Sequence, residues 1–563
     1  MKSLPSLPGL PLSRLAFSLV LGTALLAGCG GGSDSGVLFG GLPAAPAPAP
    51  APAPPAPPPA PAAEAGRWTV GDLHVHTWQS DDTQQISTLD QVLAKAFDRF
   101  GLDWVAISDH LRLSSYDNAG NKLPAQIPFS EGMAKYQVPR IKALQAGGKY
   151  ADKTIFASAE WDMPAHDHGN VGILTDSPMS DAALKAVSQF EYLFTNRDAA
   201  LFPAADVAAW GPKAGTGYNT HAETMQAVAW LKKNYPATSY LQINHPSRNP
   251  GKYTIAQLRE MNDLAPDIVF SLEGMVGNQM EPDRGGYNSA YIDANLPSRT
   301  YGGVDYLVAK LGGTWDALLS EGRRIWNVAD SDYHFTTSQG LYSSGYAPGE
   351  YAKNHLFGDI KDPKSLLAAM RTGRLFAVNG DLIDALDFRV EGSKGAGRMG
   401  SELAAAAGEE LRITVRFRSP ERNNFEYQLG SGLYANVKPV VDHIDLIAGD
   451  VTGREQPGTP GYDRATNPST RVVKRFTRAD WKLDAEGYYA ASFTVKAGAN
   501  QYFRLRGTNL GTDVPGETAN GEPLPDARTE GNDNVARFNA INARNYADLW
   551  FYSNPVFVKV AAK

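Results

Sequence analysis

Histidines and carboxylates recur at short spacings along the first two thirds of the chain. Four of the ten histidines form two His-x-His pairs, His74 with His76 and His166 with His168. Random placement of ten histidines in 563 residues would give about 0.2 such pairs. Residues two apart lie on the same face of a strand, so each pair can present two imidazoles to one ligand. Imidazoles grouped with carboxylates are typical ligands of Zn²⁺, Mn²⁺ or Fe²⁺.

The chain has one cysteine, Cys29, and it lies near the N-terminus. A single cysteine excludes an internal disulfide, a cysteine-rich zinc site and an iron–sulfur cluster. We therefore expect histidine, aspartate and glutamate to hold any metal ion. The net charge of −7 indicates no general attraction to nucleic acid or to anionic lipid.

Short apolar runs alternate with helical patterns from Trp68 onward, which favours βα units and a mostly parallel sheet. The strands expected from these runs are 68–73, 104–107, 154–158, 170–174, 240–243, 268–272 and 325–329. The helices expected between them are 89–100, 222–233, 254–264 and 314–321. Such strands predict a barrel related to the eight-fold (β/α) barrel, whose chemistry lies beyond the C-terminal strand ends.

Nearly every expected strand borders a side chain that can bind a metal, mostly at its C-terminal end. These side chains are His74, His76, His110, Glu160, His166, His168, His245, Glu273, Asp330, Asp332 and His334. Convergence of the strand ends would collect them at one site. Isolated histidines are expected instead to be surface or hydrogen-bonded residues, as for His221, His355 and His443.

In order and spacing, these residues resemble the polymerase and histidinol phosphatase (PHP) superfamily of metal-dependent phosphoesterases. The resemblance rests on Asp72-Leu-His-Val-His-Thr77 followed by Ser80-Asp81, on Ile107-Ser-Asp-His110, on Glu160, and on Asp330-Ser-Asp-Tyr-His334. It covers roughly residues 67–379, and the stretches 315–324 and 365–379 resemble the carbaryl-hydrolase-like branch. It implies a distorted (β/α)7 PHP-type barrel that binds two or three divalent metal ions.

Position by position, the resemblance implies three metal sites that share residues. The implied ligands are His74, His76, Glu160 and Asp332 for the first ion, Glu160, His168 and His245 for the second, and Asp81, His110 and His334 for the third. Some members have histidine where this chain has Asp81. The residues expected to take part in catalysis are Glu160, His168, Asp332 and His334. Supporting contacts to the ligands are expected from His166, Asp109, Asp167 and Glu273.

This ligand set predicts hydrolysis by a hydroxide that bridges two ions, because such ions acidify a shared water and stabilise charge on a phosphoryl or acyl centre. The favoured substrate is a small-molecule phosphate mono- or diester. A carbamate or carboxylic ester is the alternative on the same metal centre. The alternative from another class is a non-catalytic surface lipoprotein that binds a glycan or a protein. Arg248 can steer an anionic substrate or be an ordinary surface arginine.

The N-terminal 66 residues are expected to contain a targeting signal followed by a flexible tether. The apolar run 15–27 follows Lys2 and Arg14 and has the length of a signal-peptide core. Leu26-Ala27-Gly28-Cys29 resembles the lipobox of bacterial lipoproteins, in which the cysteine is lipidated. We expect a signal peptide over 1–28, lipidation at Cys29, and a disordered Gly/Ser- and Pro/Ala-rich tether over 29–66. The protein would then be lipid-anchored in the bacterial cell envelope; the alternative is a plain secretory signal.

The remaining chain divides by pattern into two predicted domains. Residues 67–382 would form the barrel, with inserts near 111–152 and 177–235 that can wall the site. Residues 383–563 show alternating apolar runs separated by Gly-, Pro- and Asn-rich turns, which predict an antiparallel β-sandwich. The sandwich is expected to be a structural module, and carbohydrate or surface binding is its alternative role.

Overall fold

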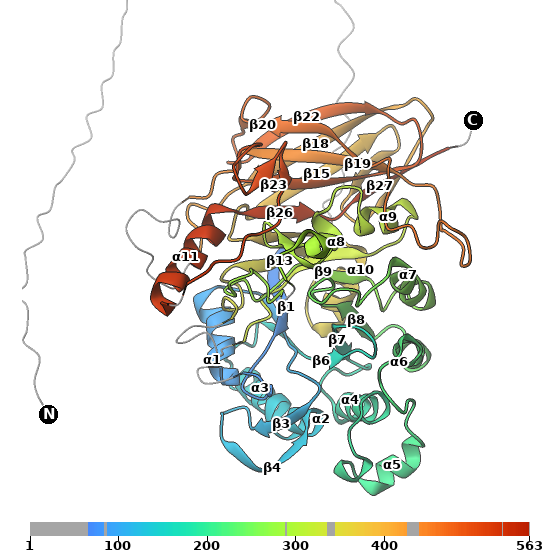
Figure 1. Ribbon diagram of the computed structural model, residues 1–563, viewed down its shortest axis with the longest axis vertical. Helices are drawn as coiled ribbons and strands as arrows, with labels where there is room; N and C mark the ends of the chain where they lie inside the picture. The colour runs from blue at the N-terminus through green and yellow to red at the C-terminus, as the bar shows by residue number, and fades with distance from the viewer. Residues whose placement is uncertain are drawn as a thin grey trace, which may run out of the picture. The chain divides into compact units, whose positions relative to one another are not determined.

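The computed structural model describes residues 66–83, 87–287, 290–334, 344–424, 438–531 and 533–561. Glu64–Lys563 form one compact unit of mixed α/β structure (Figure 1). The predicted signal peptide, Cys29 and all but the last residue of the predicted tether lie outside the described residues. Within the described ranges, no helix combines the length and the apolar character needed to cross a membrane.

The strands that carry the candidate ligands fall into two sheets, and the chain passes from one to the other at Ser158. The first sheet has parallel neighbours β1 (Arg67–Val75), β2 (Trp104–Ile107) and β5 (Thr154–Ala157). The second sheet has the order β12 (Trp326–Ala329), β9 (Ser271–Met275), β8 (Ser239–Ile243), β7 (His168–Ile173) and β6 (Ala159–Asp162).

The structure shows no closed barrel among the described residues, and the expected mostly parallel arrangement is wrong in part. Strand β7 pairs antiparallel with both β6 and β8. The connection between β6 and β7 is residues 163–167, which is too short for the crossover that a parallel pair needs. Strands β13 (Ala352–Gly358) and β14 (Leu375–Asn379) also add antiparallel to β1 and to each other.

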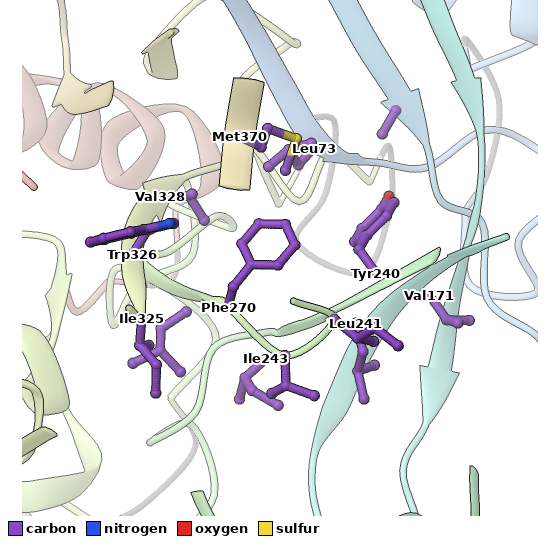
Figure 2. Close-up of a cluster of buried hydrophobic side chains, with 14 of the residues drawn as sticks. Leu73, Val171, Tyr240, Leu241, Ile243, Phe270, Ile325, Trp326, Val328 and Met370 are labelled. Atoms are coloured by element: carbon purple, nitrogen blue, oxygen red, sulfur yellow. The ribbon is translucent and has the colours of Figure 1, made fainter. Parts of the chain in front are cut away.

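Helices cover these sheets, and several of them begin at a side-chain cap. Capping boxes start α6, α7 and α10, the first through Thr220 and Glu223. The helices are α1 (Leu89–Leu93), α2 (Phe129–Gly132), α3 (Val138–Ala146), α4 (Asp181–Phe194), α5 (Ala204–Trp210), α6 (His221–Asn234), α7 (Ile255–Leu264), α8 (Tyr306–Ala309), α9 (Thr314–Ser320), α10 (Pro363–Thr372) and α11 (Asn534–Ala547). Figure 2 shows the apolar core around β8, β12 and α10, where Phe270 and Trp326 are buried.

The insert 177–235 forms α4, α5 and α6, and its aromatic side chains pack on one another. Phe190 contacts Trp161, Phe194 and Trp230 with ring centroids 5.0 to 5.9 Å apart. Packing, rather than an open binding surface, therefore accounts for these aromatics. Two short hairpins complete this half: β3 (Leu113–Tyr116) with β4 (Lys122–Pro128), and β10 (Thr300–Tyr301) with β11 (Val304–Asp305).

The C-terminal third builds two facing layers around a second core. One layer is antiparallel: β16 (Gly395–Arg398), β15 (Ala385–Gly392), β18 (Glu410–Arg418), β22 (Tyr489–Lys496) and β21 (Lys482–Leu483). The other contains β17 (Glu402–Ala405), β19 (His443–Asp450), β20 (Arg471–Thr477), β23 (Gln501–Thr508), β26 (Trp550–Ser553) and β27 (Val556–Val560). A small hairpin, β24 (Thr518–Ala519) with β25 (Glu522–Pro523), lies beside it.

The second layer is continuous with the first sheet of the ligand-bearing half. Strand β26 pairs antiparallel with β14, with Val378 opposite Phe551. Phe376 and Val378 of β14 are fully buried in the C-terminal core. One sheet therefore runs from β17 through β14 to β1 and β5 and joins the two halves of the chain.

Candidate metal centre

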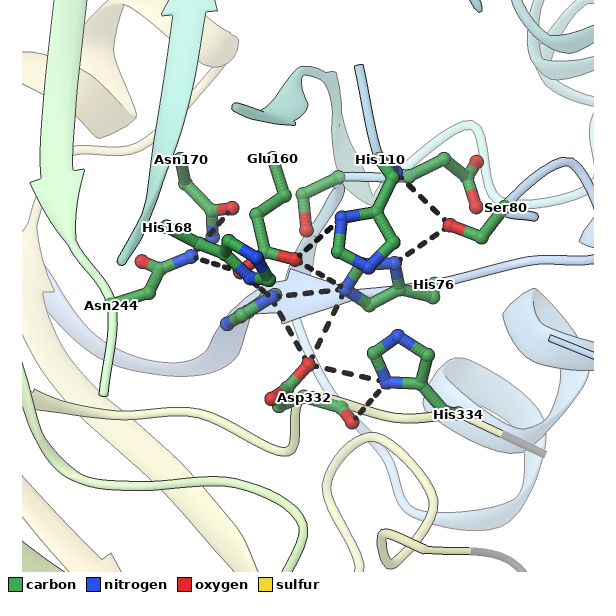
Figure 3. A network of polar contacts seen from close by, with 12 residues as sticks. His76, Ser80, His110, Glu160, His168, Asn170, Asn244, Asp332 and His334 are labelled. Carbon is green, nitrogen blue, oxygen red and sulfur yellow. Dashed lines mark hydrogen bonds and ion pairs between the residues drawn. The ribbon is translucent and has the colours of Figure 1, made fainter. Parts of the chain in front are cut away.

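The predicted ligands converge although they lie far apart in the sequence (Figure 3). They are supplied by the end of β1 (His74, His76), β6 (Glu160), the start of β7 (His168), and the loops that follow β2 (His110), β8 (His245) and β12 (Asp332, His334). Because β7 runs antiparallel, its first residue lies at the same edge as the last residues of the parallel strands. Most of these side chains are fully buried.

The first group places four ligand atoms around one point. His74 Nε2 lies 3.0 Å from Glu160 Oε1, 3.1 Å from Asp332 Oδ1 and 3.0 Å from His76 Nε2. His76 Nε2 lies 3.3 Å from both Glu160 Oε2 and Asp332 Oδ1. Ligand atoms bound about 2.1 Å from one ion are about 3.0 Å apart on an octahedral edge and about 3.4 Å on a tetrahedral edge. The spacing is that of a coordination shell.

The second group shares Glu160 with the first. Glu160 Oε1 lies 3.1 Å from His168 Nδ1 and 3.2 Å from His245 Nε2. The same oxygen accepts a hydrogen bond of 2.9 Å from Asn244 Nδ2, which fixes the carboxylate. Asn244 carries no recognisable motif, although it directly precedes His245 in the sequence. Glu160 is therefore placed to bridge two cations.

The third group contains Asp82 in place of the predicted Asp81. Asp82 Oδ2 lies 2.9 Å from His110 Nε2, and Asp82 Oδ1 lies 3.4 Å from His334 Nε2. Asp81 instead pairs with Arg112, with 3.2 Å between Oδ1 and Nη1. The two aspartates are adjacent in a turn, so their side chains point in different directions, and the sequence motif alone leaves both available.

The donor atoms fit divalent cations. Within the described ranges, Glu160 Oε2, Asp332 Oδ1, His110 Nδ1 and His168 Nδ1 are buried and make no hydrogen bond. Buried polar atoms are nearly always hydrogen-bonded, and these four lie within 3.4 Å of other ligand atoms. Lone pairs that face a common centre without a hydrogen are suited to a cation. Nitrogen and carboxylate donors in this mixture suit Zn²⁺, Mn²⁺ or Fe²⁺.

The charges around Glu160 lead to the same conclusion. Burial alone would raise the pKa of Glu160, but His168, His74 and His110 hold that pKa well below its usual range. For His74, burial opposes protonation, yet Asp332, Glu160 and Glu273 raise its pKa well above the usual value. The proton that these carboxylates favour on His74 would balance part of their charge when no cation is bound. Cation binding would replace this proton.

Neighbouring side chains hold the outer nitrogens of the ligand imidazoles. His74 Nδ1 lies 3.2 Å from Glu273 Oε2, and His76 Nδ1 lies 2.8 Å from Ser80 Oγ. The other pairs are His245 Nδ1 with Asp167 Oδ1 at 3.4 Å and His168 Nε2 with Asp162 Oδ1 at 3.1 Å. Such contacts fix the tautomer and turn the opposite nitrogen toward the ion. No motif marks Asp162, which Arg112 holds in turn through a hydrogen bond of 2.7 Å.

Two residues considered from sequence lie outside the cluster. His166 Nδ1 lies 2.6 Å from the Lys252 carbonyl, and its Nε2 lies 2.8 Å from His221 Nδ1, so it contacts no ligand side chain by these nitrogens. Asp109 accepts hydrogen bonds from Thr77 and Gln137 and braces the turn after β1.

Arg248 is not a surface arginine. Its side chain is 15% exposed, and Nη2 lies 2.7 Å from Asp332 Oδ2. Its Nε is buried and has no hydrogen-bond partner in the part of the chain that the structure describes. A guanidinium with an unused donor therefore lies directly beside the candidate metal ligands.

No protein-family model matches the chain, and no curated protein matches it. The chain is similar to a crystal structure from Bacteroides vulgatus, described as a two-domain protein containing a predicted PHP-like metal-dependent phosphoesterase. The identity is 12%, the TM-score is 0.33, and the similarity covers 82% of this chain and 94% of that chain. Side-chain geometry, and not this similarity, supports a role for the cluster as a metal centre.

Proposed function

We propose that this protein is a metal-dependent hydrolase that acts on phosphate esters and uses two or three divalent ions. The observation that carries the proposal is the convergence on Glu160 of imidazole and carboxylate donors at coordination-shell spacing. Such ions, when bound, polarise an ester and lower the pKa of a coordinated water. The candidate ligand groups support the assignment that the PHP resemblance implies, and we place Asp82 instead of Asp81 in the third group.

The residues of this chain would have distinct tasks. Glu160 would hold two cations at a fixed separation, and Asn244 keeps its carboxylate in place. Asp332 would offer Oδ1 to a cation, because its Oδ2 is bound by Arg248. Glu273, Ser80 and Asp162 would keep the imidazoles oriented, so that substrate binding needs no rearrangement of the ligands.

Arg248 is the specific reason to favour a phosphate ester over a carbamate. A buried guanidinium with a free Nε–H is suited to bind an anionic oxygen, and arginine recognises phosphate with particular strength. A neutral carbamate or carboxylic ester offers no charge to this group. Hydrolysis of such an ester remains the alternative that the resemblance to the carbaryl-hydrolase-like branch allows.

Metal content and turnover test the proposal together. The purified protein should contain at least two equivalents of Zn, Mn or Fe, and should hydrolyse members of a panel of aryl phosphate monoesters, diesters and carbamates. His76→Ala should lose metal and turnover, because His76 belongs to the first ligand group and also lies beside Asp82, His110 and His334 of the third. His221→Ala is the matched control, since its imidazole contacts His166 and Glu260 instead of the cluster. A folded, metal-free wild-type protein would instead favour the non-catalytic lipoprotein.

We also propose that Cys29 carries a lipid and anchors the protein in the cell envelope. The motif Leu26-Ala27-Gly28-Cys29 supports this, together with the proline-rich stretch that follows. Pro/Ala-rich chain of this kind is extended, at about 3.1 Å per residue, and would hold the folded unit away from a membrane.

A further inference from the structure

We infer that the C-terminal segment 526–548 positions the metal centre by holding the loop that orients Asp332. The loop, residues 276–286, follows β9. We call it the bracing loop. The inference rests on the proposed metal centre and gives the C-terminal third of the chain a role in it.

The bracing loop touches Asp332 directly. Asn278 donates from Nδ2 to Asp332 Oδ2, and the Asn278 backbone N–H donates to the Ser331 carbonyl at 3.1 Å. At Gly277 a Cβ atom would lie 2.1 Å from Asp332 Cβ, so the backbone of the loop packs against the aspartate with no side chain between them. With Oδ2 occupied by Asn278 and Arg248, Asp332 Oδ1 faces His74 and His76.

The backbone here adopts unfavourable conformations that require support. The φ angle is 44° at Asp332, 53° at Asn278 and 59° at Arg284. Non-glycine residues rarely adopt this left-handed region and keep it only where the surroundings fix them. The alignment of Asp332 is therefore not a property of its own segment alone.

Arg284 fixes the far end of the bracing loop to the C-terminal segment. Its side chain is fully buried, and all five guanidinium N–H groups are used. Nε bonds Gln279 Oε1 at 3.1 Å, and Nη2 bonds the Tyr351 hydroxyl at 3.0 Å and the Asp548 carbonyl at 2.7 Å. Nη1 bonds Asp526 Oδ1 at 2.9 Å and also the Asp548 carboxylate. Because every N–H group of this guanidinium is hydrogen-bonded, a shift of the loop would break several of these bonds at once.

Helix α11 adds a second attachment. Asn545 Nδ2 donates to the Gln279 carbonyl at 2.6 Å, one residue from Asn278. Arg544 Nη1 donates to the Pro282 carbonyl at 3.0 Å. Two sets of contacts therefore connect the C-terminal segment to the bracing loop, one at Arg284 and one at Gln279 and Pro282. The carboxylates of Asp526 and Asp548 serve this attachment, since Arg284 bonds both.

Metal affinity separates a positioning role from a purely structural one. Arg284→Met and Asn545→Ala would be made in the full chain and titrated with Mn²⁺ against a competing chelator. Direct supporting contacts of metal ligands are worth about 10- to 100-fold in affinity, and Arg284 acts one contact further away through the bracing loop, so we expect Arg284→Met to weaken binding at the Asp332 site by about tenfold. Asn545→Ala removes a smaller part of the attachment and should weaken it about fivefold. The kcat of either variant at saturating Mn²⁺ should recover toward the wild-type value.

Arg506→Met is the matched control. Arg506 is equally buried, and its side chain bonds Asp445 and Glu522 instead of the bracing loop. It should lower Tm as Arg284→Met does while changing metal affinity by less than about twofold. If Arg284→Met does not fold, the Mn²⁺ affinity of Asn545→Ala tests the inference in its place. Unchanged metal affinity in the folded variants, or an equal loss in Arg506→Met, would overturn the inference. A wild-type protein that binds no metal would refute the proposed function itself.

Discussion

Asp81 and Asp82 provide a matched pair for testing the third cation site. Asp81→Asn and Asp82→Asn each remove one negative charge from adjacent residues and change the side-chain shape little. Both side chains are partly exposed, at 37% and 43%. Any difference between the variants therefore reports what each carboxylate faces.

The contacts of the two carboxylates set the expected magnitudes. Asp82 lies 2.9 Å from His110 and 3.4 Å from His334, and although burial opposes it, those histidines hold the pKa of Asp82 below its usual range. Supporting contacts of ligands are worth up to about 100-fold, so loss of a direct ligand should weaken the third site by at least about 100-fold, or ~2.7 kcal/mol. Asp81 pairs with the part-exposed Arg112, which is worth about 0–1 kcal/mol, so Asp81→Asn should change affinity less than about fivefold.

Isothermal titration of the chelated protein with Mn²⁺ measures both values, and kcat/KM on an aryl phosphate gives an independent readout. We expect one weak binding event to disappear in Asp82→Asn and to remain in Asp81→Asn. Equal losses in the two variants, or a larger loss in Asp81→Asn, would show that the geometry around His110 and His334 does not hold an ion.

Three further predictions concern the substrate, the pH dependence and the membrane anchor. Arg248→Met should lower kcat/KM for a phosphate monoester about 10- to 100-fold more than for a neutral carbamate, both at saturating Mn²⁺, because loss of the contact with Asp332 affects both substrates whereas loss of a hydrogen bond to a charged group affects only the phosphate; equal effects on both would contradict a role in anion binding. Although burial opposes it, Glu160 and Asp162 raise the pKa of His168 to about 10 in the metal-free protein. This stabilisation is complete below the unfolded pKa of about 6.5 and is lost as the pH rises through the folded pKa, so Tm of the chelated protein should fall between about pH 7 and pH 10, and saturating Mn²⁺ should remove the fall. A flat Tm across that range would argue against the protonated imidazole. Cys29→Ser should move the protein from the membrane fraction to the soluble fraction, whereas a plain secretory signal predicts no change on fractionation.

The candidate metal ligands could be predicted from sequence where neighbouring residues form a recognisable motif. His74 and His76 follow an apolar run at strand spacing, and the motif that ends at His334 has the same form, so residue type and spacing indicate the ligands. The choice between Asp81 and Asp82 depends on a turn and on Arg112, which is thirty-one residues from Asp81 in sequence. Which of the two aspartates faces the histidines therefore depends on tertiary contacts and not on the local sequence.

The direction of the strand near residue 170, and the residues that hold the ligands in place, were harder to predict because both depend on contacts between distant segments. Periodicity identifies a strand near residue 170 but not that it pairs antiparallel, which follows from the short connection 163–167. Arg284 and Asn278 show no motif, because their partners are Asp526, Asp548 and Asp332. Such contacts join distant segments and leave no pattern in either one.

The continuous sheet across β14 and β26 has a practical consequence for protein engineering. A fragment that stopped near residue 382 would expose Phe376 and Val378 and leave the β26 side of β14 as an open strand edge, which promotes edge-to-edge aggregation. The ligand-bearing and C-terminal halves should thus be expressed as one polypeptide, or supplied as two pieces that can reassemble. Grafting either half onto another protein would require a substitute for the missing strand.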